Sequence, residues 1–309
     1  MTYTHQLYSK NSKPSRPFAI AEGLSVTLIW ASSLIFIKMG LGYIGPLTMA
    51  GLRYCLAFLC LLPFMFRNGK SLDFPSSMWT RLIIMGLSAY TIGNGAIFWG
   101  LKFVSPTTVS FLLSLSPIFI IFAGSLWLKE LPSQFQIAGT VLCLIGSWLF
   151  FQPGMKEGET IGIIIEAAGI ISFGIFGIIG REVAREQQID TISLTAIPLA
   201  FGGGILLLIA LLIEGLPKLT TTSLLIVAWL ATVNTAFAYI LYNHSLKVLT
   251  ALEMNVLFNL MPLFTALLSW LFLDERLITI QIIGMLTVIS GVIFVQAGKK
   301  TDATERGKI

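Results

Sequence analysis

The fold of this chain is decided by a stretch that occurs twice. Residues 110–151 read SFLLSLSPIFIIFAGSLWLKELPSQFQIAGTVLCLIGSWLFF, and residues 255–296 read NVLFNLMPLFTALLSWLFLDERLITIQIIGMLTVISGVIFVQ. A shift of 145 residues, the difference between 262 and 117, aligns the two copies without a gap and pairs Pro117 with Pro262. The same shift pairs further residues, namely Leu126, Leu128, Glu130, Gln136, Gly139 and Gly146 with Leu271, Leu273, Glu275, Gln281, Gly284 and Gly291, and upstream Leu101-Lys102 with Leu246-Lys247. Shared proline, glycine and polar positions at one constant shift indicate an internal duplication.

The composition places the whole chain in a membrane. Of its 309 residues, 55% are hydrophobic and only 11% are charged, whereas about a quarter of an average soluble domain is charged. Apolar runs long enough to span a bilayer recur at residues 20–39, 46–66, 81–101, 107–128, 133–151, 160–180, 191–213, 223–243, 251–273 and 278–297. These ten runs predict an all-α polytopic membrane protein with ten transmembrane helices. Too few residues remain for a soluble catalytic or nucleotide-binding domain.

The duplication predicts two repeats of opposite orientation. Each repeat holds five predicted helices, and because five is odd, the second repeat enters the membrane from the other side. The predicted organisation is a tail at 1–19, a first repeat at 20–151, a linker at 152–159, a second repeat at 160–297 and a tail at 298–309. Inverted repeats are typical of transporters that expose one midplane site alternately to the two sides. Duplication as a record of gene history alone is the other interpretation.

The basic residues predict the orientation. With the N-terminus inside, fourteen Lys and Arg residues flank the cytoplasmic ends of the predicted helices, and only four, Lys102, Lys156, Lys218 and Arg276, flank the outer ends. We therefore expect a multi-pass protein of the plasma or inner membrane with both termini cytoplasmic. The net charge of +5 comes from basic residues that gather at one set of helix ends and orient the protein, so no nucleic-acid partner is expected. The first apolar run leads into many more, which favours a retained anchor over a cleaved signal peptide.

Two patterns resemble those of a known family. The blocks Pro117-x11-Lys129-Glu130-x5-Gln136-x2-Gly139-x6-Gly146 and Pro262-x11-Asp274-Glu275-x5-Gln281-x2-Gly284-x6-Gly291 resemble the EamA-type repeat of the drug/metabolite transporter superfamily. The run LIWASS at 28–33, followed by Lys38 and Arg53, is similar to that family's first-repeat pattern, although the family usually has Trp-Gly where this chain has Trp30-Ala31. The resemblance extends over about residues 20–297. It implies secondary export of small metabolites, often amino acids, with proton coupling and a cavity lined by helices one, three, four, six, eight and nine.

Two cationic side chains lie within predicted spans. A Lys or Arg deep in hydrocarbon costs about 3 kcal/mol even on the lenient insertion scale. Lys38 and Arg53 are therefore candidates to bind or guide a substrate carboxylate. In the other interpretation, Lys38 extends its ammonium group to the membrane interface and Arg53 satisfies carbonyls at a helix end.

The duplicated block contributes a second group of candidates. Asn255 and Asn259 stand four residues apart, hence on one helix face, and the duplication places Ser110 and Ser114 at the corresponding positions. In each copy a proline follows three residues later and frees a backbone carbonyl. We expect these two faces to contribute polar groups to a midplane substrate site. Hydrogen bonding between helices is the alternative.

Aromatic and amide side chains of other spans complete the candidate site. Substrate cavities combine aromatic walls with a few placed polar groups. The candidates in the third span and in its repeat partner, together with two tryptophans, are Tyr90, Asn94, Asn234, Tyr239, Trp30 and Trp99. Aromatic belts that face the lipid are the alternative for the tryptophans.

The acidic residues near span ends are assigned structural roles. Glu22, Glu166 and Glu253 lie at or just within span ends, where a buried carboxylate could carry a proton. Interfacial positions require no such function, so the structural interpretation is favoured for each. Proton coupling is therefore expected from the family resemblance and not from any residue. Glu130 and Glu275 fall at helix turns, where each can cap backbone donors of the next helix.

The sequence lacks the motifs that would indicate an enzyme or an ATP-driven transporter. His5 and His244 accompany no metalloprotease or serine-hydrolase motif, and the three cysteines lie in apolar segments without metal-ligand spacing. Gly69-Lys70-Ser71 does not end a phosphate-binding loop, because Phe64 stands where that motif requires glycine.

We therefore expect a non-enzymatic secondary active transporter that exports small metabolites, foremost amino acids, by alternating access and without a metal or cofactor. The expected partners are a small-molecule substrate, the lipid bilayer, protons and a second copy of the chain. A membrane-embedded enzyme, a channel or a lipid-handling scaffold without transport activity is the alternative.

Overall fold

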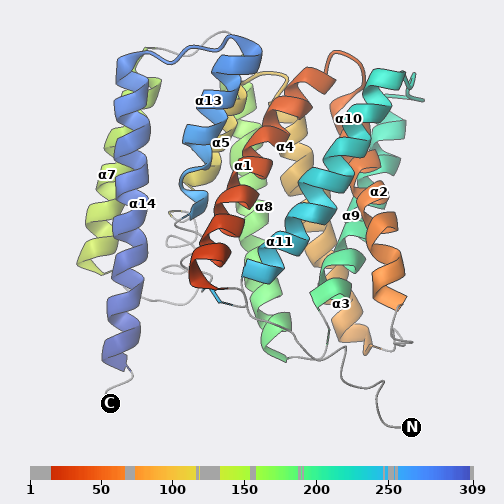
Figure 1. Ribbon diagram of the computed structural model, residues 1–309, viewed down its shortest axis with the longest axis horizontal. Coiled ribbons are helices and arrows are strands. Elements are labelled where there is room, and N and C mark those ends of the chain that lie inside the picture. The colour runs from red at the N-terminus through yellow and green to blue at the C-terminus, as the bar shows by residue number, and fades with distance from the viewer. Residues whose placement is uncertain are drawn as a thin grey trace.

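A computed structural model describes residues 15–66, 74–115, 118, 133–153, 158–186, 189, 191–245, 248–249, 254 and 257–306. Within these ranges every regular element is a helix, and the helices pack into a bundle (Figure 1). Seven of the described helical segments are long and apolar enough to cross a membrane. The chain is therefore a multi-pass, all-helical membrane protein over the residues described.

The first half of the chain begins with two helices of membrane-spanning length, α1 (Arg16–Gly40) and α2 (Pro46–Phe66). The next span, residues 76–100, consists of three consecutive segments: α3 (Ser76–Gly86), the π-helix η1 (Leu87–Asn94) and α4 (Gly95–Gly100). The shorter helix α5 (Pro106–Ser114) and the helix α7 (Gln134–Phe151) follow.

The second half has the same succession. It begins with α8 (Glu159–Glu186) and α9 (Thr191–Ile213). A span in three segments follows, made of α10 (Thr221–Ala231), the π-helix η2 (Thr232–Phe237) and α11 (Ala238–Ser245). The last helices are α13 (Met261–Leu273) and α14 (Thr279–Arg306).

The observed helices agree with the predicted spans in place and differ at their ends. Seven of the ten predicted spans coincide with the seven membrane-length segments. The other three contain the helices α5, α13 and α14, and the fourth and ninth lie partly outside the described residues, so the count of ten stays a prediction. The helix α1 begins at Arg16, with Pro17 in its first turn, and α14 continues to Arg306 through the predicted tail. Apolar windows miss such ends because a helix runs on into polar residues.

Four pairs of corresponding elements in the two halves start 145 residues apart. The pairs α2 and α9, α3 and α10, η1 and η2, and α7 and α14 begin at residues 46 and 191, 76 and 221, 87 and 232, and 134 and 279, each 145 apart. The duplicated sequence thus accompanies duplicated helices, including the rare π-helical segment in the middle of a span.

Corresponding helices of the two halves pack against each other. The helices α7 and α14 lie side by side at one edge of the bundle (Figure 1), where Gly146 approaches Gly284 and Gly139 approaches Gly291. Because residue numbers rise along one helix as they fall along the other, the two helices are antiparallel. A Cβ atom at Gly146 would lie 2.7 Å from the carbonyl oxygen of Gly284, so only glycine allows this approach.

The helices α2 and α9 form a second antiparallel pair. Gly51 lies against Leu207, and Gly203 lies against Tyr54, so the residue numbers again run in opposite directions. This pair belongs to the main apolar core, which also includes side chains of α1, α3 and α10. The core holds the polar residues described below at fixed positions.

The duplicated glutamines cap the starts of α7 and α14. At the start of α7, the N–H of Ser133 donates to Oε1 of Gln136 at 2.8 Å. At the start of α14, the N–H of Ile278 donates to Oε1 of Gln281 at 3.2 Å. The capping role expected for Glu275 therefore belongs to Gln281 in this turn, and Glu130 lies outside the described residues.

Candidate substrate site

The middle of the bundle contains two π-helical segments, η1 and η2, each within a membrane-length span. Such segments widen the helix by one residue per turn and occur frequently at functional sites. Side chains satisfy some of the displaced carbonyls. Asn94 Nδ2 donates to the carbonyl of Ala89 at 2.8 Å, and Thr235 Oγ1 donates to the carbonyl of Leu230 at 2.9 Å. The two segments place Tyr90 and Asn234 in the interior of the protein.

Arg53 of α2 lies at the centre of the residues that converge there. Only 7% of the residue is exposed. Its guanidinium donates from Nε to Thr235 Oγ1 at 2.9 Å, from NH1 to Ser33 Oγ at 2.8 Å and from NH2 to the carbonyl of Asn234 at 3.3 Å. These bonds join α2 to α1 and η2. The guanidinium also lies 5.4 Å from the centre of the Tyr54 ring and 5.7 Å from that of Phe98.

The described partners of Arg53 are all neutral. A guanidinium has five N–H donors, and the bonds above use three of them. Among the described residues no carboxylate pairs with it. A buried cation without a counter-ion is costly, and planar guanidinium groups bind carboxylates with two parallel bonds. The arrangement is therefore suited to receive an anionic group from outside the protein.

Aromatic side chains cover this position. The rings of Tyr54 and Tyr90 are 5.0 Å apart, and the hydroxyl groups of Tyr90 and Tyr239 lie 3.4 Å apart. The ring of Tyr239 is 5.8 Å from that of Trp30. We call the residues Trp30, Arg53, Tyr54, Tyr90, Asn234 and Tyr239 the Arg53 cluster. Its members come from α1, α2, η1, η2 and α11, and all except Tyr54 were predicted from the sequence.

Asn234 joins the Arg53 cluster to α1 by hydrogen bonds. Its Nδ2 donates to the carbonyl of Ile29 at 2.5 Å and to Ser32 Oγ at 3.1 Å. Its Oδ1 is buried without a hydrogen-bond partner among the described residues. One acceptor thus stays unused beside the guanidinium of Arg53. A ligand that brings both an anionic group and a donor matches this pair.

Lys38 lies elsewhere and has a local function. Its Nζ donates to the carbonyls of Leu101 at 2.5 Å and Val104 at 3.1 Å. These carbonyls belong to the turn that follows α4, and cations bind such unsatisfied carbonyls well. Lys38 therefore ties α1 to this turn and does not join the Arg53 cluster.

Four more predicted residues are bonded within their own helices or lie at the surface. Ser110 Oγ donates to the carbonyl of Thr107, Ser114 Oγ to that of Phe111, and Asn94 to that of Ala89, as given above. Trp99 is 37% exposed and contacts no ring of the cluster. The structure does not bring these four residues into the cluster.

The helices α5 and α13 break at corresponding positions. Beyond Ser114, the N–H of Leu115 donates to the carbonyl of Leu112 at 3.0 Å, and before α13 the N–H of Leu260 donates to that of Leu257 at 3.0 Å. The two bonds are again 145 residues apart. Asn259 is 5% exposed at the second break, and its Nδ2 has no hydrogen-bond partner among the described residues. Asn255 and Pro117 lie outside the described residues.

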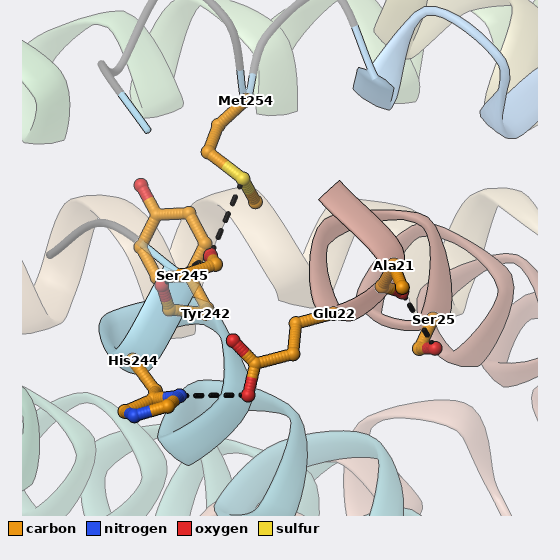
Figure 2. A network of polar contacts seen from close by, with 7 residues as sticks. All are labelled: Ala21, Glu22, Ser25, Tyr242, His244, Ser245 and Met254. Atoms are coloured by element: carbon orange, nitrogen blue, oxygen red, sulfur yellow. Dashed lines mark hydrogen bonds and ion pairs between the residues drawn. The ribbon is translucent and has the colours of Figure 1, made fainter. Parts of the chain in front are cut away.

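The sequence did not single out the contact that joins α1 to the end of α11 (Figure 2). Glu22 is 7% exposed, and its Oε1 lies 2.7 Å from Nδ1 of His244. Beside it, Ser245 Oγ donates to the carbonyl of Tyr242 and to the sulfur of Met254. Glu22 is thus a buried group whose Oε1 is paired across two helices. The sequence does show Glu22 as an acidic residue near the end of a span. It does not show the contact, because His244 is 222 residues away along the chain.

Comparison with known proteins decides the family. The EamA-like transporter family matches residues 18–152 and again residues 160–296, which together are nearly the whole chain. The chain belongs to the EamA-like transporter family. The resemblance found in the duplicated blocks is thereby confirmed.

Relatives of this EamA-like chain are named as transporters. An "Uncharacterized transporter" of Archaeoglobus fulgidus is 29% identical over 275 residues, which are 86% of this chain and 92% of that protein. A "Probable amino-acid metabolite efflux pump" of Escherichia coli is 23% identical over 87% of this chain and 91% of its own length. One solved crystal structure has the same fold, with a TM-score of 0.65 at 18% identity, and covers 91% of this chain and 98% of its own. These names point away from an enzyme.

Proposed function

We propose that this EamA-like protein is a secondary active transporter that exports small metabolites, foremost amino acids, by alternating access. The observation that carries the proposal is Arg53, a buried guanidinium that, among the described residues, has no carboxylate partner and leaves two N–H groups unbonded. A relative named as an amino-acid metabolite efflux pump supports the substrate class. In our proposal the substrate carboxylate binds Arg53, and its side chain packs among Trp30, Tyr90 and Tyr239.

The proposed architecture is ten helices in two inverted five-helix repeats, residues 20–151 and 160–297. The constant shift of 145 residues between corresponding helices supports it, as does the family match to each half. The antiparallel packing of α7 with α14 and of α2 with α9 supports the inversion, because corresponding helices of inverted repeats run in opposite directions. Two such halves can rock about the central cluster and open it to either side in turn.

The proposed location is the plasma or inner membrane, with both termini cytoplasmic. The excess of Lys and Arg at one set of helix ends supports this orientation. A reporter protein fused after Ile309 tests it, since a fluorescent reporter matures in the cytoplasm and alkaline phosphatase is active only outside. Phosphatase activity of the fusion would contradict the orientation.

The transport proposal is tested by uptake into proteoliposomes. Labelled amino acids are offered to the native protein and to Arg53→Gln, with and without a pH gradient. We expect saturable uptake and counterflow by the native protein and their loss in Arg53→Gln. Arg276→Gln is the matched control, because it makes the same replacement at an exposed arginine.

The carboxylate assignment has its own test in the same vesicles. Amino-acid amides have the side chain and the ammonium group of the substrate but lack its carboxylate. We expect them to compete poorly with the transported amino acid in the native protein. Uptake of no compound by folded, inserted protein would favour the scaffold or enzyme alternatives, and equal competition by amides would remove Arg53 from the binding role.

A further inference from the structure

Two buried carboxylates occupy nearly corresponding places in the two halves. Glu22 lies on α1 against the end of α11, and Glu166 lies on α8 against the end of α4. A shift of 145 places Glu22 at position 167, one residue from Glu166. The sequence places both at or just within span ends, where a structural role is favoured over a proton-carrying one. In the structure Glu22 is 7% exposed and Glu166 is 0% exposed.

Glu166 lies where α8 packs closely against residues 76–104. We call this contact the seam; its members are Gly162, Glu166 and Gly169 of α8 and Gly93, Gly100 and Val104 of the other segment. Gly162, Glu166 and Gly169 share one face of α8, because residues three and four apart are neighbours on a helix. A Cβ atom at Gly162 would lie 2.8 Å from Val104, one at Gly169 would lie 3.1 Å from the carbonyl of Gly93, and one at Gly100 would lie 3.0 Å from the carboxyl carbon of Glu166. The backbones thus approach closely and leave no room for water around the carboxyl group.

The carboxyl group of Glu166 has no polar partner in this seam. Among the described residues, neither of its oxygens has a hydrogen-bond partner, and no ion pair to it is seen. The helices α4 and α5 contribute no titratable side chain. Arg181, Glu182, Arg185 and Glu186 are also on α8, but they follow Glu166 by at least 15 residues, or about 22 Å along the helix. The remaining titratable or charged groups of the neighbouring segments are Tyr90 of η1, Arg81 of α3, Glu159 of α8, the exposed Lys102, and Lys38, which binds the carbonyls after α4.

None of these groups pairs with Glu166. Tyr90 bonds Tyr239, Lys38 bonds backbone carbonyls, and Arg81 and Glu159 have interactions of their own. An ionised carboxylate that is buried without partner or water is far more costly than a neutral carboxylic acid. The closed seam therefore accommodates the acid and excludes the carboxylate.

We propose that Glu166 is a proton-binding residue that takes up one proton when α8 closes against α4 and releases it when this seam opens. On closing, the carboxylate forms an O–H bond with a proton taken from the adjoining solution. On opening, that bond breaks and the proton returns to water. The proposal rests on the proposed transport function, in which such a seam closes one mouth of the bundle. In the proposed orientation this mouth is the extracytoplasmic one.

The other end of the bundle carries the contrasting arrangement. There one carboxyl oxygen of Glu22, Oε1, lies 2.7 Å from Nδ1 of His244 (Figure 2), whereas neither oxygen of Glu166 has a partner among the described residues. The α1–α11 contact thus supplies its carboxyl group with a polar partner. In our proposal only the α8–α4 end takes up a proton, which gives the transport cycle a direction set by the pH difference.

The proton on Glu166 can be observed directly. A protonated carboxylic acid gives an infrared carbonyl band separate from those of carboxylates and amides. We expect this band in the reconstituted native protein at neutral pH, its loss in Glu166→Gln, its shift in frequency in Glu166→Asp, and its retention in Glu22→Gln. The aspartate variant keeps the test valid if the glutamine variant fails to fold. Absence of the band from the native protein, or its persistence in Glu166→Gln, would overturn the proposal.

The coupling to seam closure is measured with spin labels at Lys102→Cys and Ile161→Cys, both exposed positions flanking the seam, after replacement of the native cysteines. We expect longer distances as the pH rises, with the open-to-closed ratio changing by up to about tenfold per pH unit, the limit for one proton. Glu166→Gln should stay closed at every pH, whereas Glu22→Gln should keep the pH response. A distance between the two spin labels that does not change with pH, or one that changes equally in Glu166→Gln, would overturn the proposal. Neither measurement needs a substrate, so each can succeed or fail independently of the uptake assay.

Discussion

Replacing Arg53 by glutamine removes a guanidinium that lies among neutral partners in the centre of the bundle. The native side chain bonds Thr235, Ser33 and the carbonyl of Asn234, and two N–H groups remain for a substrate. Truncating one partner of a buried, hydrogen-bonded charge pair costs about 2–5 kcal/mol. Since each 1.4 kcal/mol is a factor of ten, we expect a substrate Kd between roughly 30-fold and several thousand-fold weaker.

The same replacement has a smaller effect on folding. Thr235 keeps its bond to the carbonyl of Leu230, and removal of an unpaired buried cation relieves an electrostatic cost that offsets the lost bonds. We therefore expect a change of about 1–2 kcal/mol in the free energy of unfolding, in either direction. Loss of binding with a nearly unchanged melting temperature separates a ligand-binding role from a structural one.

The assay is isothermal titration of the purified protein with amino acids and with their amides. We expect Arg53→Lys to bind amino acids with intermediate affinity, because it keeps the charge but loses the planar fork. Arg276→Gln should bind like the native protein. Native affinity for amino acids in Arg53→Gln, in protein that melts normally, would refute the assignment of the carboxylate to Arg53.

Three further predictions concern the scaffold. Gly146→Ala should lower the free energy of unfolding by about 1–3 kcal/mol, because the added Cβ would meet the backbone of α14. Gly174→Ala is the control: its added Cβ would have no atom of another segment within 4 Å, so the melting temperature in detergent should be nearly unchanged. Equal melting temperatures of the two variants would contradict the close approach of α7 and α14. Lys38→Met should lower stability by about 1–3 kcal/mol through the two carbonyls it leaves unbonded and should leave the substrate Kd unchanged in the titration; a large loss of affinity would restore Lys38 to the site. Gln136→Ala and Gln281→Ala should each cost about 1 kcal/mol of unfolding free energy through the lost caps, while Glu275→Ala should cost less in the same melting assay.

The amino-acid sequence determined the helical, membrane-spanning character of this protein and its division into corresponding halves. Apolar runs and the repeated proline, glycine and glutamine positions are local features, readable wherever they occur. The shift of 145 residues read from the sequence recurs between the starts of four pairs of observed elements and between the breaks after Ser114 and before Met261. The sequence also named Arg53, Tyr90, Asn234 and Tyr239 as candidates, because polar residues inside apolar runs are unusual.

Only the tertiary structure decided which of these candidates meet. Ser33 and Thr235 are ordinary hydroxyl residues in the sequence, and their contact with Arg53 depends on the packing of three helices. Lys38 and Arg53 look alike as cations within spans, but one faces helix-end carbonyls and the other faces neutral side chains. The close contact of Glu166 with Gly100 of another span is likewise invisible in the sequence. Arg53 and Thr235 are 182 residues apart, and no local pattern records a contact made by folding across that distance.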